Sequence, residues 1–242
     1  MDIGYFAFTR KAATEARDRA VQKFPHLDAK VDFPWFRTLH SLAYHCLGVG
    51  NNDLMSGSDY AVFAKETGLT VSTSVETGEE FIVKADNAIL NEINLARVRG
   101  EDLRTHYNKS DMDIEWFYFE FVERAFRQFK AAHMLMDFTD LIERLIEQQD
   151  RLPSLDVLIV DEAQDMSRLQ WKLVTALESR ADRVHLAGDD DQCVFNWAGA
   201  DVQTFLSHEG NVKVLEHSYR VPAKVHALAD KIVNRIQNRQ EK

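Results

Sequence analysis

Residues 157–165 read Val157-Leu158-Ile159-Val160-Asp161-Glu162-Ala163-Gln164-Asp165, and this stretch decides the fold class of the 242-residue chain. Its four apolar residues predict a buried strand of a parallel sheet, which ends abruptly at a cluster of acids. In open α/β sheets, ligands bind outside the carboxyl ends of the strands. Two adjacent carboxylates there could divide the work of nucleotide hydrolysis: Asp161 would hold Mg²⁺, and Glu162 would orient and deprotonate the attacking water. A strand that runs into an acidic helix N-cap is the alternative interpretation.

The chain around this stretch predicts an α/β fold. From Asp156 onward, strand and helix patterns alternate, which implies a parallel sheet covered by helices. The predicted strands are 157–160, 184–187 and 212–215, and the predicted helices are 167–178, 201–206 and 222–237. Near the N-terminus we expect a strand at 3–8, a helix at 9–24, an extended piece at 35–37 and a helix at 38–47.

The middle of the chain, roughly 49–135, predicts a mainly helical insertion into this sheet. Helices are expected at 86–99, 114–132 and, just beyond the insertion, 138–149, whereas 48–58 and 70–80 have the composition of loops. Phe117, Phe121 and Ala125 share one helical face, flanked by Tyr118 and Val122. We expect that aromatic stripe to pack in the core rather than to bind a ligand.

Composition excludes several classes of protein. The hydrophobic fraction of 45% is ordinary for a globular domain. No apolar run approaches the roughly eighteen residues needed to cross a bilayer, so no membrane partner is expected. The N-terminus does not resemble a secretory signal, and Cys46 and Cys193 lie far apart, which predicts reduced thiols in a cytoplasmic protein. The net charge of −10 argues against non-specific coating of nucleic acid, but a local basic groove is compatible with a cluster near the start, formed by Arg10, Lys11, Arg17, Arg19 and Lys23.

A second predicted strand, 184–187, also ends in polar residues, which are Gly188-Asp189-Asp190-Asp191-Gln192. Glycine permits close approach of the backbone, and Gln192 offers both a donor and an acceptor to a phosphate or to its attacking water. An acidic tight turn is the alternative, since Asp and Gly dominate turns. Phe195 and Trp197 follow; exposed on a loop they could stack on bases, whereas buried they would be core residues.

A third segment, Leu215-Glu216-His217-Ser218-Tyr219-Arg220, places an arginine after a predicted strand. Such an arginine could reach a γ-phosphate across a cleft. Most arginines lie on solvated surfaces, so this segment alone does not distinguish the two interpretations.

In order and spacing, these segments resemble the motifs of the UvrD/Rep branch of superfamily 1 helicases. Residues 161–165 resemble the family's Walker B motif, 188–201 its motif III and 215–220 its motif IV. Upstream, Ala-Phe-Thr-Arg-Lys-Ala-Ala at 7–13 resembles motif Ia, Thr-Leu-His-Ser at 38–41 resembles motif Ib, and 137–141 matches a further family pattern. The motifs span nearly the whole chain in the family's order, which makes the resemblance specific.

The resemblance implies a role for each matching residue. Asp161 would bind Mg²⁺, Glu162 would be the catalytic base, Gln192 would sense the γ-phosphate of ATP, and Arg220 would stabilise transferred charge. A track for single-stranded DNA would be lined by Phe8, Thr9, Arg10, Thr38, His40, Phe195 and Trp197. Members of this family are ATP-driven DNA translocases, so the implied cofactors are ATP and Mg²⁺ and the implied partner is single-stranded or partly duplex DNA.

Two departures from the family pattern bear on activity. None of the ten glycines precedes a lysine, so the Gly-x-x-x-x-Gly-Lys-Ser/Thr loop that cradles phosphates is missing, and Ala198 stands where motif III commonly has an arginine. The implied organisation is a first RecA-like ATPase domain, incomplete at its N-terminus, at 1–48 and 136–210, the helical insertion at 49–135, and the start of a second RecA-like domain at 211–242.

Two functional hypotheses remain. The first is part of an ATP-dependent DNA helicase or translocase core, with little or no activity alone, completed by the remainder of the helicase or by a partner subunit. The second is a DNA-binding or regulatory module, derived from such a helicase, that has lost hydrolysis. Retention of Asp161, Glu162, Gln192 and Arg220 favours the first hypothesis, and the missing phosphate loop favours the second.

Overall fold

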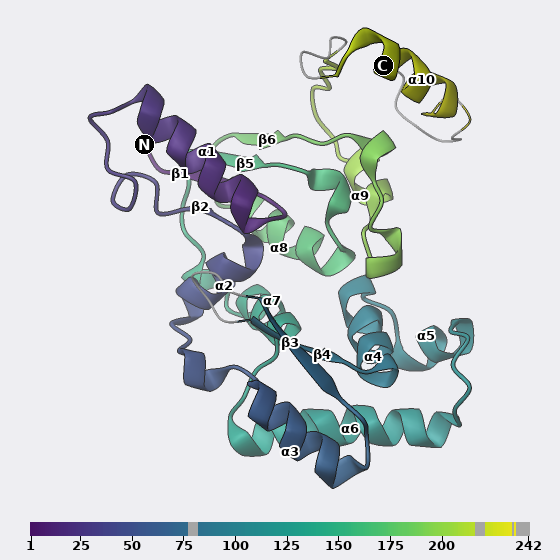
Figure 1. Ribbon diagram of the computed structural model, residues 1–242. Helices are drawn as coiled ribbons and strands as arrows, with labels where there is room; N and C mark the ends of the chain where they lie inside the picture. The colour runs from purple at the N-terminus through teal and green to yellow at the C-terminus, as the bar shows by residue number, and fades with distance from the viewer. Residues whose placement is uncertain (77–81, 216–220, 234, 236–242) are drawn as a thin grey trace.

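The computed structural model describes residues 1–76, 82–215, 221–233 and 235 of the chain (Figure 1). A parallel sheet of four strands in the order β2-β1-β5-β6 organises it. Its strands are β1 (Ile3–Phe6), β2 (Phe36–Arg37), β5 (Val157–Val160) and β6 (Val184–Leu186). Phe6 pairs with Val160, and Val160 pairs with Leu186, so three strands end at the same edge.

Helices surround this sheet and fill the insertion. Those outside the insertion are α1 (Arg10–Lys23), α2 (Leu39–Leu47), α7 (Phe138–Glu147), α8 (Arg168–Glu178), α9 (Val202–Leu206) and α10 (Ala223–Val233). The insertion contains α3 (Gly57–Thr67), α4 (Ala88–Arg99), α5 (Leu103–Lys109) and α6 (Trp116–His133), with a hairpin of β3 (Ser72–Glu76) and β4 (Ile82–Asp86). Short 3₁₀ turns are η1 (Asn51–Asp53), η2 (Gln149–Arg151), η3 (Ala163–Asp165), η4 (Asp190–Gln192) and η5 (Asn196–Ala198).

Capping side chains set where several of these helices begin. Thr9 accepts a hydrogen bond from the Ala12 N–H at the start of α1, and Ser167 forms a capping box with Gln170 at the start of α8. Such caps satisfy backbone donors that have no partner inside the helix. The sequence positions of these caps explain why the predicted helix starts agree closely with the structure.

One hydrophobic core joins the sheet to three helices. Phe6, Leu158 and Val160 are each 0% exposed and contribute to a cluster that also contains the buried residues of α2, α7 and α8. Successive side chains of a strand point to opposite faces, so the alternate residues Leu158 and Val160 mark the covered face of the sheet. The predicted α/β class, a parallel sheet flanked by helices with a mainly helical insertion, is confirmed.

A second hydrophobic core belongs to the insertion. Its buried members all lie between Met55 and Leu135, whereas Leu54 and Met136 belong to the sheet's core. The chain enters and leaves the insertion at one place, where the Met55 N–H donates to the Met136 carbonyl over 2.9 Å. The predicted boundary at 49 and 135 stays a prediction, and this division of the core is the observation that supports it. Among the described residues, no helix is both long enough and apolar enough to cross a membrane.

Two loop predictions and one strand prediction were wrong. The segment 70–80 contains β3, whose threonine and valine favour extended backbone, and the segment 48–58 contains η1 and the first residues of α3. Residues 212–215 do not form a strand; Val212 and Leu215 are 72% and 83% exposed, and a strand needs a neighbour for its backbone groups.

The predicted core role of the aromatic stripe on α6 was wrong for its two phenylalanines, whereas the flanking Val122 is fully buried. Phe117 is 73% exposed and Phe121 36% exposed. The buried face of α6 is centred on the side of Val122 and also carries Phe119 and Phe126, at helical spacing. Because both faces carry aromatic side chains, the pattern of the helix alone could not show which face packs inward.

A buried ionic network fastens the insertion to α7. The Arg97 guanidinium on α4 lies 2.8 Å from Asp137 and 2.6 Å from Glu143, and the Lys130 ammonium on α6 lies 2.5 Å from Asp137 and 2.6 Å from Asp140. Burial by itself raises the pKa of Asp137, but the charges of Arg97 and Lys130 outweigh burial and hold that pKa at about 2. The network therefore keeps the Asp137 carboxylate ionised while it joins three helices.

Replacing Arg97→Met should lower the free energy of unfolding by about 3 kcal/mol, because Glu143 would lose its cation and the carboxylates of Asp137 and Asp140 would share the single charge of Lys130. Urea unfolding measures this change. Arg127→Met is the matched control, because its ion pair with Glu123 spans 3.5 Å with the Arg127 side chain 71% exposed, and its loss should cost about 1 kcal/mol or less. Equal effects of the two substitutions would show that the network adds no more than a surface pair.

Candidate active site

The turn after β5 carries the two predicted hydrolytic acids. Asp161 continues the strand, and its N–H donates to the Phe6 carbonyl over 2.8 Å. The Asp161 carboxylate accepts hydrogen bonds from the Tyr5 hydroxyl on β1 and from the Glu162 N–H. Glu162 has a left-handed backbone, with φ 54°, which costs a non-glycine residue roughly 1–2 kcal/mol. The chain therefore turns sharply at Glu162, directly after the strand.

Burial and charge affect the groups around this turn. The pKa of the Tyr5 hydroxyl is raised, first by burial and then by its hydrogen bond to Asp161 and the negative charges of Asp161 and Glu162. The pKa of Asp165 is raised by burial and by the charge of Glu162. The turn is therefore strongly electronegative, and a carboxylate set of this kind offers the hard oxygen ligands that Mg²⁺ prefers. Of these acids, Asp161 is the predicted metal ligand.

Gln164 connects this turn to the loop after β6. Its side chain is 1% exposed; its Nε2 donates to Glu162 over 2.8 Å, and its Oε1 accepts from the Asp189 N–H over 3.0 Å. A second link is the hydrogen bond from the Ala163 N–H to the Ala187 carbonyl, at 3.0 Å. The two polar strand ends that the sequence predicted separately are thus one hydrogen-bonded unit.

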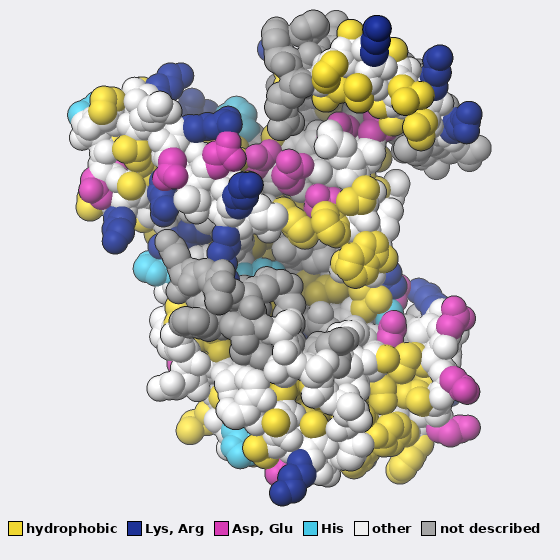
Figure 2. All heavy atoms as spheres, viewed as in Figure 1, with side chains coloured by type: hydrophobic (Ala, Val, Ile, Leu, Met, Phe, Trp, Pro, Cys, Tyr) yellow, Lys and Arg dark blue, Asp and Glu magenta, His cyan; other side chains and the backbone are white. Residues whose placement is uncertain are grey.

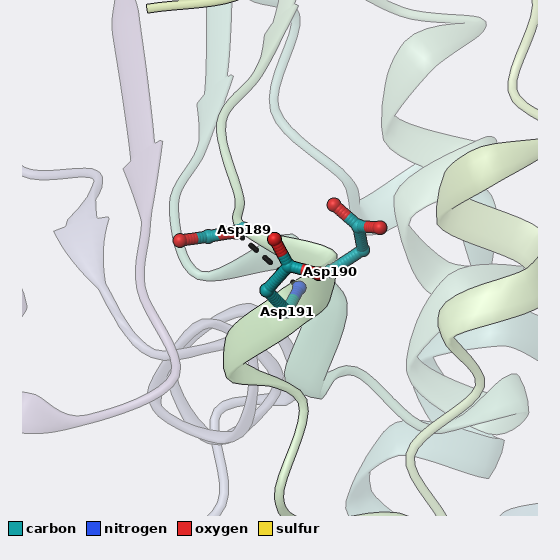
Figure 3. Close-up of side chains that lie close together, drawn as sticks. All are labelled: Asp189, Asp190 and Asp191. Carbon is teal, nitrogen blue, oxygen red and sulfur yellow. Dashed lines mark hydrogen bonds between the residues drawn. The ribbon is translucent and has the colours of Figure 1, made fainter. Parts of the chain in front are cut away.

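Three acids project from the loop after β6 (Figure 3). Oxygen atoms of Asp189, Asp190 and Asp191 lie within 4.8 Å of one another, a grouping that could hold a metal ion. The Asp189 carboxylate also accepts hydrogen bonds from the Asp191 N–H and from the exposed amide of Gln192. Gln192 is therefore held at the edge of the sheet with its amide near solvent, and its predicted role as γ-phosphate sensor stays a prediction.

An aromatic row joins the loop after β6 to the end of β1. The rings of Phe8 and Phe195 are 5.2 Å apart, and those of Phe195 and Trp197 are 6.3 Å apart. Trp197 is 73% exposed, and Phe8 and Phe195 are half-buried. The structure thus brings together residues predicted from two separate motifs, with an exposed ring at one end on which a base could stack.

The same loop contacts the insertion. Gly199 has a φ of 98°, and a Cβ added there would lie 2.9 Å from Val98 on α4. The Arg99 guanidinium donates to the Asn196 carbonyl over 3.3 Å. Any movement of α4 would therefore displace the loop that carries Phe195 and Trp197.

A basic groove of about 810 Å³ runs along α1 and the segment 36–41. Its basic lining consists of Arg10, Lys11, Arg17, Arg19 and Arg37, with Glu15 and Asp18 as the acids, and it also includes Thr38. Figure 2 shows acidic side chains across the sheet-bearing half of the molecule and basic side chains beside them, on the side of α1. Four of the five basic residues predicted to cluster, all but Lys23, line this groove.

Three predicted DNA-contact residues have structural roles of their own. Thr9 caps α1, and Thr38 caps α2 by accepting from the Ser41 N–H over 3.2 Å. The His40 ring packs 5.5 Å from the ring of Phe138. Their contribution to DNA binding stays a prediction, and Arg220 lies outside the described residues.

Sequence reasoning missed two residues of the site. Tyr5 and Gln164 were not singled out, although both contact the predicted hydrolytic acids. Tyr5 sits in an apolar strand pattern that hides its hydroxyl, and it stacks on Phe36 at 5.3 Å. Gln164 stands within the quoted acidic stretch, so its position was visible, but its partner Asp189 comes from a different strand.

The fold and this site define the chain as a RecA-like α/β domain with paired acids at the carboxyl edge of its sheet. The family model described as the UvrD/REP helicase N-terminal domain matches residues 2–213. The chain belongs to that family.

Curated relatives are named as DNA helicases. The chain is 25% identical over 250 residues to the ATP-dependent DNA helicase Rep of Buchnera aphidicola subsp. Baizongia pistaciae, covering 96% of this chain and 36% of that protein. It is 25% identical to DNA helicase II of Haemophilus influenzae, covering 93% of this chain and 33% of that protein. It is 26% identical to the ATP-dependent DNA helicase PcrA of Bacillus subtilis, covering 97% of this chain and 33% of that protein. The chain thus spans about a third of the length of these relatives.

Replacing Gly199→Ala should lower the free energy of unfolding by about 2–3 kcal/mol, because the new methyl group would add a clash with α4 to the strain of a positive φ. Gly48→Ala is the matched control: Gly48 has a φ of 66°, but nothing lies within 4 Å of an added Cβ, so strain alone should cost about 1 kcal/mol. Urea unfolding of both variants measures the difference. Equal losses would mean that the loop and α4 are not tightly packed.

Proposed function

We propose that this chain is the part of an ATP-dependent DNA helicase or translocase core that holds the hydrolytic acids and a track for single-stranded DNA. The observation that carries this proposal is that hydrogen bonds connect the predicted hydrolytic acids to the loop of the predicted DNA track. Glu162 is hydrogen-bonded to Gln164, which is bonded to Asp189 at the start of the loop that carries Phe195 and Trp197. The names of the relatives agree with this assignment.

On this proposal, the residues after β5 fit Mg²⁺ and the attacking water. Asp161 would hold the metal, since its carboxylate lies at the end of a strand and its position is fixed by Tyr5 and by the turn. Glu162 would orient the water and accept its proton, and Gln192 would contact the γ-phosphate. Bound ATP would supply the phosphate bond that is broken, and bound Mg²⁺ would supply positive charge that offsets the acids. Arg220 is proposed to stabilise the transferred charge.

The phosphate cradle would come from elsewhere. The sequence contains no glycine followed by lysine, so a loop of the Gly-Lys-Ser/Thr type is not among its residues. β6 is an edge strand of the described sheet, with Val184 36% exposed, and offers an edge at which a further strand could add. We propose that the remainder of the helicase, or a partner subunit, completes the nucleotide site.

The second candidate is a DNA-binding or regulatory module without hydrolysis. The basic groove along α1 and the aromatic row favour it, because neither needs a nucleotide in order to bind a strand. Lysine and arginine would neutralise phosphates, and exposed rings would stack on bases. The acids at Asp161 and Glu162 favour the first candidate.

An ATP hydrolysis assay tests the missing cradle, an expectation that the two candidates share for the chain alone. The chain alone should show no turnover above the blank, with or without single-stranded DNA, because most of the affinity for the phosphates comes from the missing cradle. The assay is phosphate release by the native chain and by Glu162→Gln. DNA-stimulated turnover that disappears in Glu162→Gln would contradict this expectation and would mean that other groups hold the phosphates.

Replacing Trp197→Ala should weaken binding of single-stranded DNA about 10-fold, since stacking of one base on an aromatic ring contributes roughly 1–3 kcal/mol. Fluorescence anisotropy of a labelled oligothymidylate measures the affinity. Phe117→Ala is the matched control, because Phe117 is equally exposed at 73% but lies on α6, away from the aromatic row. An equal loss of affinity in both variants, or none in Trp197→Ala, would argue against the proposed track.

A further inference from the structure

We infer that Gln164 is a positioning residue that transmits the state of the DNA-binding loop to the catalytic base Glu162. The inference rests on the proposed function, since it takes Glu162 as the base and Phe195 and Trp197 as the DNA track. It adds a residue to which neither the motif comparison nor the sequence pattern assigned a role.

The chemistry of the amide suits this role. Gln164 donates to the Glu162 carboxylate over 2.8 Å with one end and accepts from the Asp189 N–H over 3.0 Å with the other. An amide offers a donor and an acceptor side by side on one rigid plane. A carboxylate in its place would keep the acceptor but would repel Glu162, and an apolar side chain would leave a buried N–H without a partner.

The loop after β6 holds Gln164 on several sides. A Cβ added to Gly188 would lie 2.7 Å from the Gln164 Oε1 and 3.2 Å from its backbone nitrogen, so only glycine leaves room for this amide. The Cys193 thiol donates to the Gln164 carbonyl over 3.3 Å. With its side chain 1% exposed, Gln164 cannot exchange these partners for water without moving the loop.

The consequence is a mechanical coupling. The loop that contacts Gln164 at Gly188, Asp189 and Cys193 continues directly to Phe195 and Trp197. A strand stacked on Trp197 would fix that loop, and the loop would fix the amide that orients the Glu162 carboxylate. Glu162 has a left-handed backbone at the end of the strand, and the hydrogen bond from Gln164 is the contact through which the loop would orient the Glu162 carboxylate.

Hydrogen–deuterium exchange of the full chain tests the coupling without any nucleotide. Without DNA, Glu162→Ala should speed exchange in residues 188–197 about 5-fold, the loss expected for one net hydrogen bond. In the Gln164→Met background the same substitution should cause no further change. The control Thr139→Val removes a different buried side-chain hydrogen bond, that to Asn94, and should leave 188–197 unchanged. Independent effects of the two site substitutions would overturn the inference.

A second arm adds a short oligothymidylate. Binding should slow exchange in 188–197 in every variant, and it should also slow exchange in 161–165 in the native chain but not in Gln164→Met. Equal transmission to 161–165 in Gln164→Met would show that Gln164 is not the route. If DNA leaves 188–197 of the native chain unchanged, the proposed DNA track is wrong, while the DNA-free comparison still decides the role of Gln164.

Gly188→Ala is a second variant that tests the same coupling if Gln164→Met does not fold. Its new methyl group would displace the same amide from the opposite side, so it should reproduce the loss of coupling while far-UV circular dichroism stays native. Preserved coupling in a folded Gly188→Ala chain would contradict the inference.

Discussion

The parallel pairing of β1, β5 and β6 is the constraint on which the rest of the structure depends. Phe6, Val160 and Leu186 lie side by side in register, so the segments that follow them leave the sheet at one edge. A shift of one residue would turn Leu158 and Val160 away from the core and would send Asp161 to the other face. The hydrophobic core and the site are therefore fixed by the same register, and neither can change alone.

Much of this could be predicted from the sequence, because the signals are local. The apolar run at 157–160 ends at acids, and capping residues such as Thr9 and Ser167 mark helix starts, so strands, helices and candidate acids followed directly. Contacts between distant segments could not be predicted in this way. The link from Gln164 to Asp189 depends on which strands are neighbours, and the exposed face of α6, with Phe117, depends on where α3 and α4 pack.

Two of the contacts between the insertion and the sheet-bearing domain differ in kind, and the difference bears on how the insertion could move. Arg97 and Lys130 bind the carboxylates of α7, whereas Gly199 and Asn196 hold the loop after β6 against α4. The first contact is ionic and buried, so breaking it would leave charges without partners. The second is a close van der Waals approach with one hydrogen bond and is easier to open. A movement of the insertion would therefore loosen the aromatic loop before it loosened α7.

The two proposed activities of this chain would take place on surfaces of opposite charge. The carboxyl edge of the sheet carries Asp161, Glu162 and the three acids from Asp189 to Asp191, and such an edge repels a triphosphate unless cations and backbone N–H groups offset it. The groove along α1 has the opposite charge and attracts a phosphate backbone without help. On the proposed function, binding of a nucleic acid strand would need only the residues of this chain, whereas nucleotide binding would also need a phosphate cradle from elsewhere. For the chain by itself, this difference in charge favours the proposed binding of a strand over the proposed hydrolysis, which would need Asp161 and Glu162 together with a phosphate cradle.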